Sequence, residues 1–213
     1  MLAEYLISAA VIVAVGFLTD FIAGLRSRWG EQHLPAAAQI ELSDDDQKMV
    51  EKTQTLITHS FGNDVVDTLR NASNKDRIAL FADFAEQLAA LYGLDITVDV
   101  TVNNLKNCGA YNWAEKKAVF NIAMLTVDGN HPHFAFCVKE TLDTIVHELR
   151  HAVQHRVVEE PGFWNVDEKR RLLWARNMTQ GHYIKPEVDL RAYAGQPIEK
   201  DASTFAAAVM EGV

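Results

Sequence analysis

The spacing of apolar side chains along this chain is helical at first, then alternating, then helical again. Residues 43–57, 63–71 and 74–94 are predicted to form three helices. Ser43 and the three acids after it have the chemistry preferred at a helix N-terminus, and Gly93 can close the third helix. The predicted apolar stripe of that third helix comprises Ile78, Phe81, Ala85, Leu88 and Leu91.

Strict alternation of apolar and polar residues begins at residue 95 and predicts a half-buried strand over 95–102. Residues 109–113 and 118–125, separated by the short polar stretch AEKK, are predicted to form a hairpin. Helical spacing returns at 139–155 and again at 196–210. Helices, then a small sheet, then helices again indicate an α+β fold. The alternating apolar residues of the first strand are Ile96, Val98, Val100 and Val102.

Residues 5–25 differ from the rest because they are apolar around every helical face, with Asp20 as the only charge. About 20 apolar residues span a bilayer, so we interpret residues 1–30 as an uncleaved hydrophobic membrane anchor. The alternative is a hydrophobic helix that is buried against the domain or in an oligomer.

Basic residues lie on one side of this segment alone: Arg26 and Arg28 follow it, and no lysine or arginine precedes it. The positive-inside rule then places the C-terminal part of the chain in the cytoplasm. We expect a linker at 31–43 and one domain at 44–213.

The composition narrows the possible functions only slightly. A formal net charge of -9 and the absence of a long basic block argue against a nucleic-acid-binding surface. Cys108 and Cys137 match no zinc-ribbon spacing and are expected to be unbonded thiols.

Three histidines and a glutamate lie within the predicted helix at 139–155. Its apolar positions leave His147 and His151 four residues apart on one side, so both imidazoles can reach one ion. Glu148 is directed differently and can reach a metal-bound water without binding the metal, as in the H-E-x-x-H motif of zinc peptidases. The alternative is a solvated helix face whose histidines bind nothing. The apolar positions are Leu142, Ile145, Val146, Leu149 and Val153.

A third ligand has to come from another element. His155 lies about 12 Å along the helix axis from His147, too far for one ion to bind both. The longer H-E-x-x-H-x-x-G-x-x-H pattern also fails, because Gln154 and Val157 occupy its glycine and last histidine positions.

Glu199 is one candidate for that ligand, in a predicted helix at 196–210 with Pro197 in its first turn. Small residues in this helix would allow close approach to the histidine helix. An acid near a helix N-terminus is also favourable at the surface without any metal. His182 is the competing candidate, because imidazole is an equally good ligand. The apolar stripe of the helix is Ile198, Ala202, Phe205 and Val209.

Together the two motifs resemble those of the glutamate-zincins, and specifically the ImmA/IrrE-like metallopeptidase domain. In that family H-E-x-x-H is followed by a helix that reads roughly E-x-E/D-A-x-x-F-A. The resemblance covers two short motifs and the order of elements within about 95–210. Arg150 departs from the small residue or glycine of the family, and the insertion between the motifs is long. The residues in register are Glu199, Asp201, Ala202, Phe205 and Ala206.

The resemblance implies a zincin-like domain in which His147, His151 and Glu199 bind Zn²⁺ and Glu148 is the general base. The expected function is zinc-dependent hydrolysis of a protein or peptide substrate. The hairpin precedes the histidine helix, where zincins place the strand that pairs with an extended substrate. An oxyanion donor is also needed, and Tyr193 is preferred over His182.

Two other functions stay open on the sequence. One is a non-catalytic binding or regulatory protein in which zinc only holds helices together. The other is a membrane-tethered regulatory protein whose site is covered by residues 156–196, with Trp164 and Trp174 as anchors of this lid.

Overall fold

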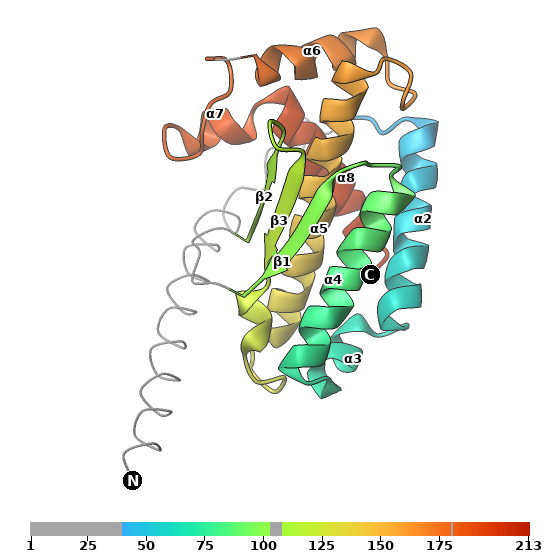
Figure 1. The fold of residues 1–213 in the computed structure, drawn as a ribbon, viewed down its shortest axis with the longest axis vertical. Coiled ribbons are helices and arrows are strands. Elements are labelled where there is room, and N and C mark those ends of the chain that lie inside the picture. The colour runs from blue at the N-terminus through green and yellow to red at the C-terminus, as the bar shows by residue number, and fades with distance from the viewer. Residues whose placement is uncertain (1–39, 103–107, 180) are drawn as a thin grey trace. The chain divides into compact units, whose positions relative to one another are not determined.

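Three helices form the first part of the computed structural model, which describes residues 40–102, 108–179 and 181–213. They are α2 (Asp44–Phe61), α3 (Val65–Asn71) and α4 (Asn74–Leu91), all close to the predicted ranges (Figure 1). The side chain of Ser43 accepts a hydrogen bond from the backbone N–H of Asp46 and so caps the N-terminus of α2, as predicted. The segment 1–30 and residues 31–39 of the linker lie outside the described residues.

Within the described part of the chain, no helix is both long enough and apolar enough to cross a membrane. The predicted membrane segment 5–25 is not among these residues.

The buried face of α4 agrees with the predicted stripe at Phe81, Ala85 and Leu88, which are fully buried, while Ile78 and Leu91 are half-buried. Phe84, outside the predicted stripe, is also fully buried. The buried face includes it because α4 packs against α2 on one side and against the sheet on another. Gly93 ends the helix as expected, with a positive φ of 69° and a hydrogen bond from its N–H to the carbonyl of Ala90.

The sheet has three strands in the order β1-β3-β2. β2 (Gly109–Asn112) and β3 (Lys117–Asn121) form the predicted hairpin, and β1 (Thr97–Thr101) pairs with β3 in parallel. The prediction that the second hairpin strand continues to residue 125 is wrong. The side-chain oxygen of Asn121 accepts a hydrogen bond from the N–H of Ala123 and turns the chain into a 3-10 helix, η2 (Ala123–Thr126).

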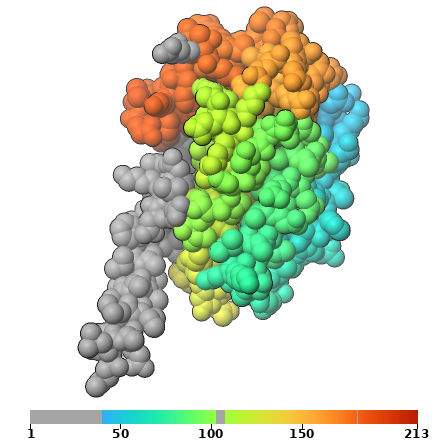
Figure 2. Space-filling view, in the orientation of Figure 1, coloured from blue at the N-terminus to red at the C-terminus, as the bar shows by residue number. Residues whose placement is uncertain are grey.

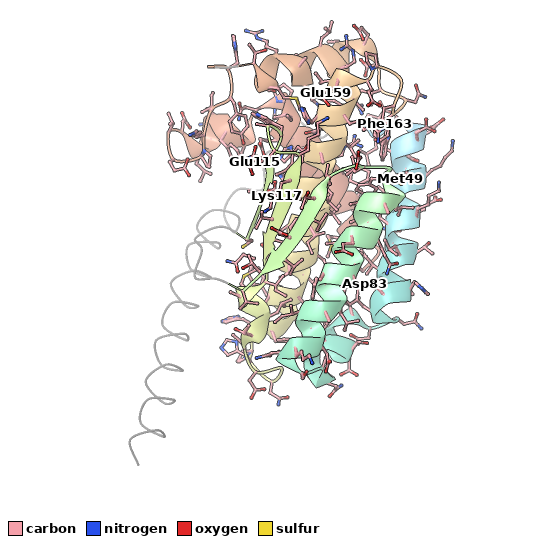
Figure 3. The ribbon with its side chains drawn as sticks, viewed as in Figure 1. Met49, Asp83, Glu115, Lys117, Glu159 and Phe163 are labelled. Carbon is pink, nitrogen blue, oxygen red and sulfur yellow. The ribbon has the colours of Figure 1, made fainter. Side chains whose placement is uncertain are left out.

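Helix α5 (Phe134–Glu159) packs against both the sheet and α8 (Pro197–Met210). The sheet lies in front of α5 in Figure 1, and α8 lies behind it. The predicted apolar positions of both helices are fully buried, so these two predictions are confirmed. The tip of the hairpin lies near the C-terminal end of α5, where Figure 3 labels Glu115, Lys117 and Glu159, and Lys116 pairs with Glu159 at 2.8 Å.

The stretch 156–196 contains two further helices, α6 (Glu168–Met178) and α7 (Leu190–Ala194). Trp164 and Trp174, which the sequence suggested as its anchors, are both buried. In Figure 2 the orange residues of this stretch adjoin the yellow-green residues of the hairpin on the visible face, and Trp113 contacts Tyr183 edge to face with ring centroids 5.7 Å apart.

Candidate metal centre

Two histidines of α5 project side by side from its buried half. The Nε2 atoms of His147 and His151 are 3.0 Å apart, as expected for imidazoles one helical turn from each other. The apolar residues between and around them are buried against α8 and the sheet, which fixes the rotation of the helix. The two histidines therefore do not lie on a solvated face of the helix, which was the alternative interpretation of the sequence.

Helix α8 supplies the third side chain. Small buried residues at 202 and 206 let it lie close to α5, as the sequence suggested. Oε2 of Glu199 is 3.4 Å from Nε2 of His147 and 3.4 Å from Nε2 of His151. The exposed fraction of the Glu199 side chain is only 3%, so it is not the surface acid of the alternative interpretation.

The three atoms fit one metal ion. Ligand atoms that lie about 2.0–2.1 Å from a tetrahedral zinc ion are about 3.3–3.4 Å from one another, close to the separations of 3.0, 3.4 and 3.4 Å observed here. In addition, Oε2 of Glu199 is buried without a hydrogen-bond partner in the described structure. His147, His151 and Glu199 thus form a group that could hold a metal ion.

The electrostatics of the group favour a cation at its centre. Burial lowers the pKa of His151, but the carboxylate of Glu199 outweighs burial and raises it to about 9. Burial raises the pKa of Glu199, yet His151 and His147 hold it well below its usual range. An arrangement that retains a proton so strongly also attracts a metal cation, because both compensate the same buried carboxylate.

Gln154 fixes the orientation of His151. The amide nitrogen of Gln154 donates to the carbonyl of Ile198 and to Asp201, so its oxygen faces His151 and accepts a hydrogen bond from Nδ1 at 2.8 Å. In the neutral imidazole this places the proton on Nδ1 and leaves the lone pair of Nε2 directed at the group. Sequence reasoning missed this role, because it considered Gln154 only as a mismatch to the longer motif.

Glu148 does not belong to the group of three and instead reaches the edge of the sheet. It is half-buried, and its Oε2 accepts a hydrogen bond of 2.8 Å from the backbone N–H of Tyr111 in β2. Gly109 makes this contact feasible, because a Cβ there would lie 2.7 Å from Thr144 and 3.3 Å from Glu148. The outer edge of β2 and the middle of α5 therefore meet at Glu148.

Two tyrosines border the group on the side of α7 and α8. The hydroxyl of Tyr183 donates to Oε1 of Glu199 at 2.9 Å, and its ring lies edge to face with that of Tyr193. Burial, followed by the carboxylate of Glu199, raises the pKa of both hydroxyls, with a smaller contribution from Glu148. Both phenols are therefore protonated hydrogen-bond donors at neutral pH.

Tyr183 was not predicted, and no periodicity or motif marks it, because only the fold brings it to Glu199. The neighbouring candidate His182 is exposed and is not part of the group.

His155 and the cysteines also lie apart from the three ligand candidates. Nδ1 of His155 is 3.0 Å from the hydroxyl of Tyr111, and its Nε2 is 3.4 Å from Glu159. Cys108 and Cys137, both within the described residues, are not joined by a disulfide, which confirms the prediction.

Comparisons of the chain with models of protein families, with curated proteins and with solved structures found no match.

Proposed function

We propose that the protein is a zinc-dependent peptidase of the glutamate-zincin type, with His147, His151 and Glu199 as the ligands. The observation that carries the proposal is the convergence of two imidazole nitrogens and one carboxylate oxygen from two helices, within 3.4 Å of one another. The resemblance of the two motifs to the ImmA/IrrE-like domain supports the same conclusion.

Zinc suits this set of nitrogen and oxygen ligands. With three protein ligands, a bound zinc ion would keep one position open, where it would activate water and polarise a substrate carbonyl.

Glu148 is the proposed general base. Its Oε2 is held by the N–H of Tyr111, which leaves Oε1 to accept a proton from the attacking water and to deliver it to the leaving amine. The hydrogen bond fixes the position of the carboxylate, and a fixed carboxylate is what general-base catalysis needs at this position.

Tyr193 is the proposed oxyanion donor. The hydroxyl of Tyr183 is engaged with Oε1 of Glu199, so its proposed role is to hold that ligand. The phenol of Tyr193 stays protonated and interacts with both Glu199 and Glu148, so it borders the proposed metal centre as a donor.

The edge of β2 is the proposed binding position for an extended peptide. The backbone N–H of Tyr111 points away from β3 and toward Glu148, so this edge of the strand is directed at the base. A substrate that adds to the edge as a further strand would pass directly beside Glu148. Tethering of the domain to the cytoplasmic side of a membrane through residues 5–25 remains part of the proposal.

Glu148→Gln tests the mechanism. In the purified full chain, this variant should retain zinc at the wild-type stoichiometry and lower the rate of peptide hydrolysis at least about 100-fold, the usual scale for a lost general base. Cleavage is measured by mass spectrometry on a mixture of unrelated peptides, and zinc by elemental analysis. Near-normal cleavage in the variant would exclude Glu148 as the base.

His147→Ala is the control for the metal, and it should lose zinc and cleavage together. If the wild-type chain binds zinc but cleaves no peptide, the centre is structural and the peptidase proposal is wrong.

A further inference from the structure

Four charged side chains from four helices meet beside the two histidines, and the mechanism proposed above does not use them. Arg150 of α5 pairs with Asp46 of α2 (Nη1–Oδ1, 2.8 Å) and with Asp201 of α8 (Nε–Oδ2, 2.8 Å), and the side chains of all three are fully buried. Arg170 of α6 lies 3.2 Å from Asp46 and 3.8 Å from Asp201. We call these four residues the charge cluster.

The charge cluster keeps Asp46 and Arg150 in their charged forms although both are buried. Burial alone would raise the pKa of Asp46, but Arg150 and the hydrogen bonds from Ser43 hold it below the usual value. Burial lowers the pKa of Arg150, and the two aspartates outweigh this and raise it. Two cations and two anions balance, so removal of any one leaves a buried charge without its counter-ion.

Gln154 connects the charge cluster to the metal centre. Its amide nitrogen donates to Oδ2 of Asp201 at 2.8 Å and to the carbonyl of Ile198 at 2.9 Å, while its oxygen accepts from His151. An amide has a donor end and an acceptor end. Two acceptors, the carboxylate of Asp201 and the carbonyl of Ile198, hold the donor end of Gln154, which turns its oxygen toward His151.

We infer that Gln154 and Asp201 are positioning residues of the metal centre. The charge cluster fixes the carboxylate of Asp201, Asp201 fixes the amide of Gln154, and Gln154 holds His151 with Nε2 directed at Glu199. The inference rests on the proposed metal binding. It adds that α2 and α6, through Asp46 and Arg170, support the ligand His151 without contacting it directly. Loss of such an outer partner of a histidine ligand typically weakens metal affinity by about 10–100-fold.

Gln154→Met in the full chain tests the inference, because it keeps the length of the side chain and removes its three hydrogen bonds. We expect zinc affinity, measured by competition with a chromophoric chelator, to fall about 10–100-fold. The visible spectrum of the Co²⁺-loaded chain should change as well, because a free imidazole ring alters the ligand field. Gln87→Met is the matched control, since within the described residues the side chain of Gln87 bonds to the exposed Asp83 on α4, and it should leave both readouts unchanged.

A reversed pair separates positioning from packing. Gln154→Glu alone places a second carboxylate against Asp201 and should weaken zinc binding. Adding Asp201→Asn supplies an amide N–H to the new carboxylate at position 154, so the double variant should recover at least about fivefold of the lost affinity.

Wild-type affinity and spectrum in Gln154→Met, or a double variant that binds no more tightly than Gln154→Glu, would overturn the inference. Wild-type zinc affinity in His147→Ala would instead contradict the metal centre itself.

Discussion

Arg150→Met removes the arginine that pairs with both aspartates of the charge cluster. The stability of this variant shows how much the buried charges contribute to folding. The variant leaves Asp46 and Asp201 buried, with only Arg170 near them, at 3.2 and 3.8 Å. Removing one partner of a buried ion pair costs about 3–5 kcal/mol of folding stability. Because Arg170 still partly compensates the two aspartates, we expect a loss of about 3 kcal/mol. In a chain of this size that corresponds to a fall in melting temperature of about 6–12 °C.

The assay is thermal unfolding of the full chain by circular dichroism, with a chelator present so that metal binding does not contribute. Arg171→Met is the control on α6, because in the described part of the chain Arg171 pairs with Glu168, whose side chain is 66% exposed. Such a pair contributes about 0–1 kcal/mol. If both variants melt within about 4 °C of the wild type, the charge cluster does not stabilise the fold as argued.

The pH dependence of this comparison has a definite sign. The pKa of Asp46 is below its usual value in the fold, so its contribution to wild-type stability is present above that usual value and is lost as the pH falls through the lowered one. In Arg150→Met, Asp46 loses its main counter-ion, and protonation of this carboxylate relieves the excess negative charge. The difference in stability between the two chains should therefore narrow as the pH falls.

Two further predictions concern the ligand set and a second buried acid. Glu199→Ala should lose most of its zinc after dialysis while His182→Ala keeps it, because only Glu199 lies beside the histidines; the opposite result would refute the ligand assignment. Burial and the nearby Asp143 raise the pKa of Glu140 to about 7. Between about pH 4.5 and 7 the native chain then binds more protons than the unfolded one, so its stability should fall as the pH rises across that range. At pH 8, Glu140→Gln should therefore be more stable than the wild type by about 1–3 kcal/mol. Equal melting temperatures of the two chains would contradict this prediction.

Periodicity predicted the elements on which the site is built. The helices at α2, α5 and α8 and the hairpin were all predictable because their apolar positions repeat regularly and each buries one face. The end of β3 was not predictable, because a single hydrogen bond from the N–H of Ala123 to the side chain of Asn121 turns the chain there.

The residues that support the site were harder to predict than the proposed ligands. A histidine pair four residues apart is visible within one helix, but Arg150 pairs with Asp201 at a separation of 51 residues. In the sequence, Arg150 stands out only as a departure from a family pattern, and no pattern marks Tyr183. Their roles depend on which helices are neighbours in space, and the local sequence does not contain that information.

The charge cluster also determines how α5 could be reused or changed. A helix with two histidines and a glutamate is an attractive unit to graft onto another scaffold, but this one would carry Arg150 into an apolar core without its counter-ions. A successful graft would have to include acids at the positions of Asp46 and Asp201, which come from two other helices. For the same reason, single substitutions within the cluster should be poorly tolerated during evolution, and its members should be exchanged together as a neutral set.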